Sequence, residues 1–232
     1  MGELLPVLDA ASELGVHPSR VRALIASGAL AAEKVGGVWL VDRASVAGRR
    51  HENPSAGRPL APRNAWGLLL AASGEKVPAD VGPSVRWRIR QALEVYGLSG
   101  LRSRLVRRAQ PSLHWALPGE LRALRKRGDV VLAGASAAAS YDLGIVGGDA
   151  VDAYVRDSLA DRLRREHALQ PVPGAESNVV LRLVPDAAWL LDGRRVAPLA
   201  AVALDLWAYP DPRASRVGDE VIAHLDHDRG AA

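Results

Sequence analysis

The sequence contains no cysteine, no phenylalanine and only one methionine. The absence of cysteine excludes disulfide bonds, zinc sites with thiolate ligands and a cysteine nucleophile. No stretch approaches the ~20 consecutive apolar residues of a membrane-spanning helix. No basic segment precedes the first apolar residues, so we expect no secretory signal. By elimination we expect a cytoplasmic protein that has no membrane partner.

Aromatic residues are scarce as well, with six tryptophans and four tyrosines. Apolar residues nevertheless make up 48% of the chain, an ordinary share that allows a sizeable core. Most tryptophans fall in apolar runs, so we expect them in the core rather than at a stacking surface. These are Trp66, Trp87, Trp115, Trp189 and Trp207.

Charge is distributed unevenly along the chain, although the net charge is only +4. Residues 1–128 hold 20 Lys and Arg against 10 Asp and Glu, whereas residues 129–232 hold 10 against 16. We therefore expect a basic half that binds nucleic acid and an acidic half with another role.

Composition and hydrophobic spacing divide the chain into four regions and predict an α+β fold. Residues 1–47 form a compact helical pattern with a hairpin, 48–64 have the Gly, Pro and Arg content of a linker, and 65–110 are helical. Residues 111–232 alternate short strands and helices, as in a mixed α/β domain. We expect strands at 113–116, 130–133, 150–155 and 178–184, and helices at 118–127, 136–143, 158–169, 198–209 and 212–225.

Two short helices are predicted within the first region. Asp9 is a plausible N-cap for a helix at Ala10–Leu14, and Gly15 ends it. Pro18 then opens a second helix, at a position where its missing N–H costs nothing.

The second helix has a buried face and an open face. Val21, Leu24 and Ile25 recur at helical spacing and should pack against the first helix. Small residues and two arginines remain for the outer face, which suits entry into a DNA major groove. The outer residues are Ser19, Arg20, Arg22, Ala23 and Ala26.

A hairpin directly follows this second helix. Gly36-Gly37 is the kind of pair that a two-residue turn requires, and apolar residues flank it at 32–35 and 38–41. Asp42 then caps a short helix that includes Arg43. A hairpin in this position predicts the wing of a winged helix-turn-helix.

The run from Gly15 to Leu30 resembles the MerR-type, excisionase-like helix-turn-helix domains of bacteria. It shares with them the pattern GV-x-PS-x-VR-x-LI-x-SG-x-L. The resemblance covers about the first fifth of the chain and implies DNA binding. His17 stands where such domains usually have a Ser or Thr N-cap, so either the cap is weaker or His17 contacts DNA. The hairpin tip lacks the arginines that such wings often carry. A three-helix module that binds another protein is the alternative.

The linker is basic. Arg49, Arg50, Arg58 and Arg63 lie in it, and Gly57-Arg58-Pro59 matches the Gly-Arg-Pro core of an AT-hook, which fits a narrow minor groove. Ala56 replaces the arginine that normally precedes this core. A solvated tether is the alternative. In the helical region, Leu98, Leu101, Leu105 and Val106 share one side, which leaves Arg102, Arg104, Arg107 and Arg108 for contacts with the DNA backbone.

No convincing catalytic or cofactor motif is present. Gly134-Ala135-Ser136 followed by Asp149 and Asp152 faintly resembles nucleotidyltransferases, but this spacing points the two carboxylates to opposite faces of a strand. His114, His167, His224 and His227 lack metal-binding spacing. No nucleophile elbow, phosphate loop or dinucleotide fingerprint occurs. We expect neither enzyme activity nor a cofactor or metal.

The second half of the chain is similar to the AbiEi family of type IV antitoxins. The similarity rests on Leu132–Ile145 (LAGASAAASYDLGI) and on Val196–Ala214 (VAPLAAVALDLWAYPDPRA). It covers about a hundred residues. It implies an operon repressor whose C-terminal domain provides antitoxicity against a nucleotidyltransferase-type toxin.

The sequence therefore predicts a DNA-binding transcriptional regulator, of the antitoxin type, that binds double-stranded DNA and can oligomerise on repeated sites. Two alternatives remain. One is an excisionase-like architectural protein that bends DNA, and the other is an enzyme with a nucleotidyltransferase fold.

Overall fold

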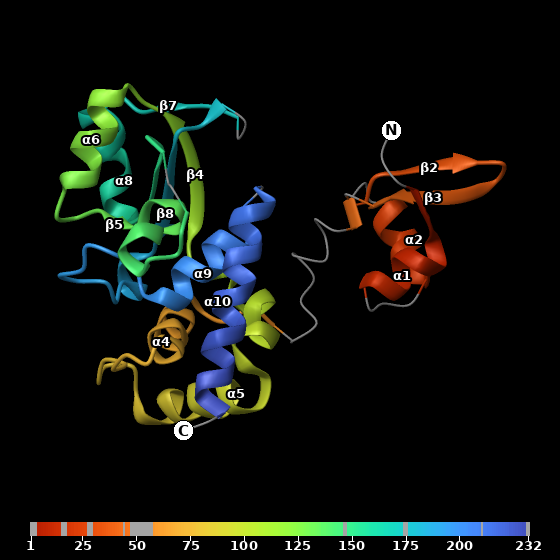
Figure 1. Cartoon of the computed structure of the whole chain (residues 1–232), viewed down its shortest axis with the longest axis horizontal. Helices are drawn as coiled ribbons and strands as arrows, with labels where there is room; N and C mark the ends of the chain where they lie inside the picture. The colour runs from red at the N-terminus through yellow and green to blue at the C-terminus, as the bar shows by residue number, and fades with distance from the viewer. Residues whose placement is uncertain are drawn as a thin grey trace. The chain divides into compact units, whose positions relative to one another are not determined.

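A computed structural model of the chain describes residues 4–14, 18–26, 30–43, 45–46, 58–145, 148–173, 176–209 and 211–230. The chain divides into two compact units, Met1–Arg58 and Pro59–Ala232 (Figure 1). Both units mix helices with β-strands, so the α+β class is confirmed. Within the described residues, none of the helices combines the length and apolar character needed to cross a membrane.

The first unit packs two helices against a small sheet. The strands lie in the order β1-β3-β2, and both pairings are antiparallel. The elements are β1 (Leu4–Pro6), α1 (Val7–Leu14), α2 (Pro18–Ala26), β2 (Ala32–Val35) and β3 (Val38–Asp42). Strand β1 was not expected from the sequence.

The core of this unit follows from helical spacing. Helix α1 buries Val7, Ala10, Ala11 and Leu14, which recur at i, i+3, i+4 and i+7 and so share one face. These side chains pack with Val21, Leu24, Leu30, Val41 and Val46. The helix begins at Val7 rather than Ala10, so the prediction of Asp9 as N-cap is wrong. Asp9 lies in the first turn, where its negative charge favours the helix dipole.

The second unit is built on a five-stranded mixed sheet in the order β5-β6-β8-β4-β7. Strands β6 and β8 are parallel and the other neighbours are antiparallel. All four strands predicted in this region are present, and strand β7 was not expected. The strands are β4 (Gln110–Trp115), β5 (Val131–Leu132), β6 (Val151–Arg156), β7 (Gln170–Pro171) and β8 (Val179–Val184).

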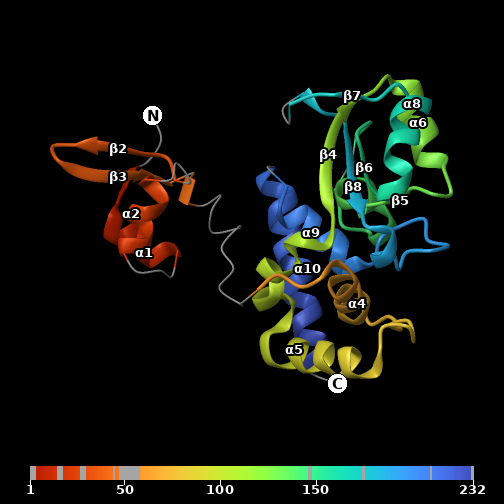
Figure 2. The same ribbon diagram turned by 180° about the vertical axis from the view of Figure 1, so that it is seen from behind.

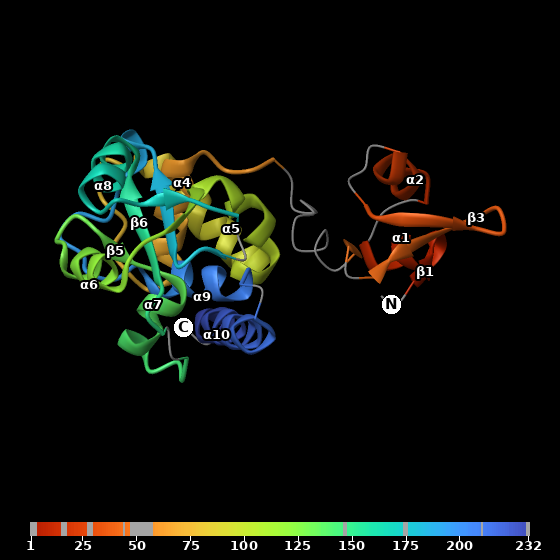
Figure 3. The ribbon, with the colours of Figure 1, turned by 90° about the horizontal axis from the view of Figure 1, so that it is seen from above.

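Helices cover both faces of this sheet (Figures 2 and 3). Helices α6 and α8 lie on one face of the sheet, and α4, α5, α9 and α10 lie on the side of the opposite face. The α-helices are α4 (Pro62–Ala72), α5 (Pro83–Leu101), α6 (Pro118–Lys126), α7 (Gly134–Ala137), α8 (Ala160–Glu166), α9 (Leu199–Trp207) and α10 (Pro212–Gly230). Short 3₁₀ helices are η1 (Arg102–Arg108), η2 (Ala138–Tyr141), η3 (Asp157–Leu159) and η5 (Asp186–Ala188).

Strand β6 separates two hydrophobic cores because its side chains alternate between the faces of the sheet. Val151, Ala153 and Val155 join the core under α6 and α8. Tyr154 joins the larger core that α4, α5 and α9 complete. All five residues from Val151 to Val155 are buried, so this strand has no solvent-facing side.

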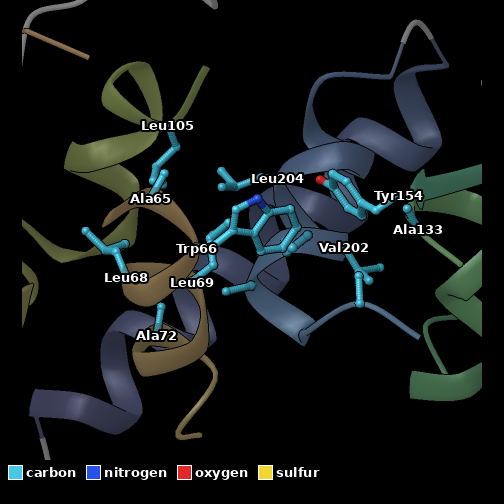
Figure 4. Packing of buried hydrophobic residues seen from close by; sticks show 14 of the residues in the cluster. Ala65, Trp66, Leu68, Leu69, Ala72, Leu105, Ala133, Tyr154, Val202 and Leu204 are labelled. Atoms are coloured by element: carbon cyan, nitrogen blue, oxygen red, sulfur yellow. The ribbon is translucent and has the colours of Figure 1, made fainter. Parts of the chain in front are cut away.

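The predicted division between residues 65–110 and 111–232 is wrong, because both ranges contribute to one core. The ring of Trp66 on α4 meets Tyr154 on β6 edge to face at 4.7 Å between centroids (Figure 4). The Trp66 indole N–H donates to the carbonyl of Arg108 at 3.0 Å. The predicted linker also ends early, since α4 begins at Pro62.

A buried charged cluster ties this core together. Asp205 of α9 is fully buried, and its carboxylate accepts hydrogen bonds from Arg108 at 2.5 Å and from the Tyr154 hydroxyl at 2.8 Å. Arg182 of β8 lies 3.1 Å from the same carboxylate and also pairs with Asp152 at 2.6 Å. Burial raises the pKa of the Tyr154 hydroxyl, which therefore stays protonated and donates to Asp205. The two arginines and two aspartates balance each other, as buried charges must.

Helix α5 contains a sharp break at Gly97, whose φ of 61° lies in the left-handed region. The carboxylate of Asp226 on α10 accepts hydrogen bonds from the backbone N–H groups of Leu98 and Ser99, at 2.5 and 3.1 Å. A Cβ at position 97 would collide with this carboxylate. A distant aspartate thus caps the second segment of the helix, and only glycine fits at the break.

Several apolar side chains lie outside the core, contrary to expectation. Trp66 and Trp189 are buried, but Trp87 is 58% exposed and Trp115 is 36% exposed. Val106 is 47% exposed, because it directly follows the buried Leu105 and so points about a third of a turn away from it.

Replacing Asp205 with alanine leaves Arg108 and Arg182 without their shared counter-charge in the interior. We expect Asp205→Ala to lower the free energy of unfolding by about 3–5 kcal/mol. Asp219→Ala is the matched control, since Asp219 also pairs with an arginine but is half exposed, and should cost at most about 1 kcal/mol. Urea unfolding followed by circular dichroism measures both, and equal losses would contradict the structural role of the cluster.

Alanine at position 97 combines an unfavourable φ with a collision against Asp226. We expect Gly97→Ala to destabilise the fold by roughly 1–3 kcal/mol in thermal or urea unfolding. Gly119→Ala in helix α6 meets no atom within 4 Å and should be neutral or slightly stabilising. A neutral Gly97→Ala variant would mean that the break is not required.

Candidate nucleic-acid interface

Helix α2 presents a stripe of small residues and one arginine to solvent. Ser19, Arg22, Ala23 and Ala26 are all exposed, and their spacing of i, i+3, i+4 and i+7 places them on one helical face. The opposite face is buried through Val21 and Leu24. This is the division expected from the sequence. Arg20 lies in the same helix, although its side chain is outside the described residues.

The hairpin after α2 has the turn that the sequence predicts. Gly36 and Gly37 have φ values of 56° and 85°, and Val35 pairs with Val38 across the turn. Two positive φ angles in a two-residue turn are typical of type I′, which only glycine-like residues adopt readily. The hairpin extends beyond the two helices of its unit (Figure 1).

The hairpin also carries residues that sequence reasoning did not single out. The Lys34 ammonium lies 5.9 Å from the centre of the Trp39 ring, a cation–π contact that holds a positive charge on this strand pair. Val35 and Val38 at the tip are 52% and 59% exposed. Strand alternation is the signal for Lys34, because it places the side chains of β2 in turn on the two faces of the sheet.

Arg43 follows strand β3 and is exposed. Its guanidinium lies 3.3 Å from the carboxylate of Glu13 on α1. An exposed pair of this kind contributes at most about 1 kcal/mol, so a phosphate can replace the carboxylate at little cost.

The two described arginines of the predicted linker lie in different units. Arg58 is exposed, at the end of the first unit. Arg63 instead lies in helix α4, where it donates to the carbonyl of Ala187 at 2.7 Å and pairs with Asp80. Arg63 therefore belongs to the second unit and not to the linker. His17, Arg49 and Arg50 lie outside the described residues.

The first unit is nearly balanced in charge, which differs from the expected basic half. Residues 1–58 hold seven Lys and Arg against six Asp and Glu. Residues 59–128 hold 13 against four. The excess of positive charge therefore belongs to the second unit.

The residues of the nucleotidyltransferase-like pattern do not assemble into a metal site. Asp149 is exposed and precedes strand β6, whereas Asp152 is buried and paired with Arg182. Burial raises the pKa of Asp152, and the neighbouring Arg182 opposes the shift. Across the described residues, no three His, Asp or Glu side chains are placed to hold a metal ion.

The four histidines are also separated. His114 is buried beside Ser112. Burial, and to a smaller extent the nearby charge of Arg164, lowers the pKa of His114. His167 is buried against Glu120 at 2.7 Å. His224 is exposed and lies 3.2 Å from Asp228 one helical turn away.

The two antitoxin-like segments pack against each other. The backbone of Leu132 bonds to Arg195 and Ala197, and the Tyr141 hydroxyl donates to the carbonyl of Ala197 at 2.7 Å. Small buried residues of α7 and α9, among them Ala137 and Ala201, lie in the same core. The shared motif residues therefore have a structural role in this unit.

Comparisons of the chain with protein-family models, with curated proteins and with solved structures found no match.

Proposed function

We propose that the protein is a sequence-specific DNA-binding transcriptional regulator whose first unit acts as a winged helix-turn-helix. In this proposal α2 enters the major groove with the stripe of Ser19, Ala23 and Ala26 facing the bases. The small side chains permit close approach, and Arg20 and Arg22 reach base edges or phosphates.

The observation that carries the proposal is the exposed, small and basic face of α2 beside a hairpin with a glycine turn. Small side chains let the helix approach a duplex closely, and an arginine on the same face can reach its bases or phosphates. The hairpin is the wing in this proposal. With Lys34 and two exposed valines, it contacts sugar and phosphate beside the groove rather than reading bases.

The regulator is proposed to be of the antitoxin type, repressing its own operon. The two segments that resemble the AbiEi antitoxins support this assignment. Helix-turn-helix units bind single half-sites weakly, so we expect two copies on a repeated or palindromic operator. A nucleotidyltransferase-type toxin is the proposed protein partner of the second unit.

Selection from a randomised duplex library tests the proposal directly. The wild-type chain should enrich one motif, and the double variant Arg20→Ala/Arg22→Ala should enrich none, because each lost base contact removes about 1–3 kcal/mol of discrimination. Arg162→Ala/Arg165→Ala on helix α8 is the control with the same change in charge and should enrich the wild-type motif. An unchanged motif in the Arg20/Arg22 variant would contradict the assignment of α2.

The basic linker leads to a separate prediction. Replacing Arg49, Arg50 and Arg58 with alanine should lower the slope of log affinity against log salt by about 2–3, since each neutralised phosphate contributes about 0.9 to that slope. Fluorescence anisotropy on the selected duplex at several salt concentrations measures it. An unchanged slope would make the linker a solvated tether.

A further inference from the structure

The solvent face of helix α5 is centred on a tryptophan. Ile89 and Leu93 bury the opposite side of this helix, while Trp87 is 58% exposed and Val95 is 67% exposed. At 100° per residue, Trp87 lies about half a turn from the middle of the buried side. Tryptophan is highly buried on average in globular proteins, so an indole with this much exposure is unusual.

Three arginines lie within three residues of this tryptophan in the sequence. Arg88 and Arg90 are exposed and Arg86 is half-buried. Among the residues that the structure describes, none of the three forms an ion pair with a carboxylate. Arg86 and Arg90 are four residues apart on the helix, where like charges destabilise it by a few tenths of a kcal/mol. Glu94 lies four residues after Arg90, but its carboxylate accepts a hydrogen bond from Gln91.

Other arginines of residues 59–128 are committed to the fold. Arg63 pairs with Asp80, Arg102 with Asp219 and Arg127 with Asp129. Arg108 is buried against Asp205. The sequence predicted that Arg102 and Arg108 would contact DNA, and the structure gives both internal partners instead. The arginines left on the surface include the three that gather on α5.

We propose that the face of α5 formed by Arg86, Trp87, Arg88 and Arg90 is a second contact with duplex DNA, independent of base sequence. The inference rests on the proposed function of the first unit and extends it to the second. A polyanion supplies the missing counter-charge for three arginines in five residues. The exposed indole contacts the apolar face of deoxyribose between the phosphates that the arginines bind.

The covalent link between the units makes this contact effective. Once α2 holds its site, binding of α5 to the flanking backbone is intramolecular, so even a weak contact raises the overall affinity. The excess positive charge of residues 59–128 then raises the affinity for DNA, while the nearly neutral first unit discriminates between base sequences. This division separates phosphate contacts from base contacts.

The first test uses the full chain with Arg86, Arg88 and Arg90 all replaced by alanine. We expect the slope of log affinity against log salt to fall by about 2–3 on the selected duplex, with the sequence motif unchanged. The control replaces Arg122, Lys126 and Arg165, which are exposed cations on α6 and α8, and should leave the slope unchanged. Equal slopes for the α5 variant and the wild type would overturn the proposal. Thermal unfolding should change little in both variants, because five of the six side chains are exposed and the sixth, Arg86, is half-buried.

The second test addresses Trp87. Trp87→Ala should weaken duplex binding roughly fivefold without changing the salt slope, since an aromatic contact of about 1 kcal/mol is lost but no charge. Trp87→Phe should restore most of the affinity. Full affinity in Trp87→Ala, or tighter binding of the wild type to a single strand of the same sequence than to its duplex, would exclude this duplex contact.

The outcomes also separate the two proposals. If no motif is selected but the α5 variant loses duplex binding relative to its control, the second contact stands and the regulator does not. If a motif is selected and the α5 variant behaves like its control, the regulator stands and the second contact falls.

Discussion

The second unit depends on one buried carboxylate. Asp205 accepts hydrogen bonds from an arginine of the helical segment and from a tyrosine of the central strand, and it forms an ion pair with an arginine of the neighbouring strand. These three partners come from parts of the chain that are far apart in sequence. Because an unpaired charge in the interior costs several kcal/mol, all of them have to arrive together. The cluster thereby specifies how helices η1 and α9 are placed on the sheet.

This constraint explains why the boundary between helical and α/β regions does not exist. Trp66 packs on the tyrosine that donates to Asp205, so the helix after the linker is part of the sheet's own core. In the sequence, the helical pattern of residues 65–110 is followed by alternating strands and helices, which predicts a boundary near residue 110. The division follows composition, whereas the fold follows the contacts of a few buried polar groups.

Secondary structure is predicted best where the buried residues repeat with the period of a helix or form a continuous apolar run. Helix α1 and strands β6 and β8 were found because their apolar residues repeat at 3.6 or lie in a continuous run. Strands β1 and β7 were missed because they are two or three residues long, include a proline and gain their structure from neighbours. On α2, the open face followed from the buried one. On α5, Trp87 was assigned to the core by its type, since only the packing of neighbouring helices decides which face is covered. The Asp152–Arg182 pair was hidden for a similar reason, because a strand buried on both sides shows no alternation.

The short outer strands limit how copies of the protein associate. Strand β5 has two residues and its outer backbone already bonds to Arg195 and Ala197, while β7 ends in a proline. Such edges offer almost no unpaired backbone to a second chain, so the sheet resists edge-to-edge aggregation. Any association of two molecules through this sheet therefore has to use side chains rather than strand pairing.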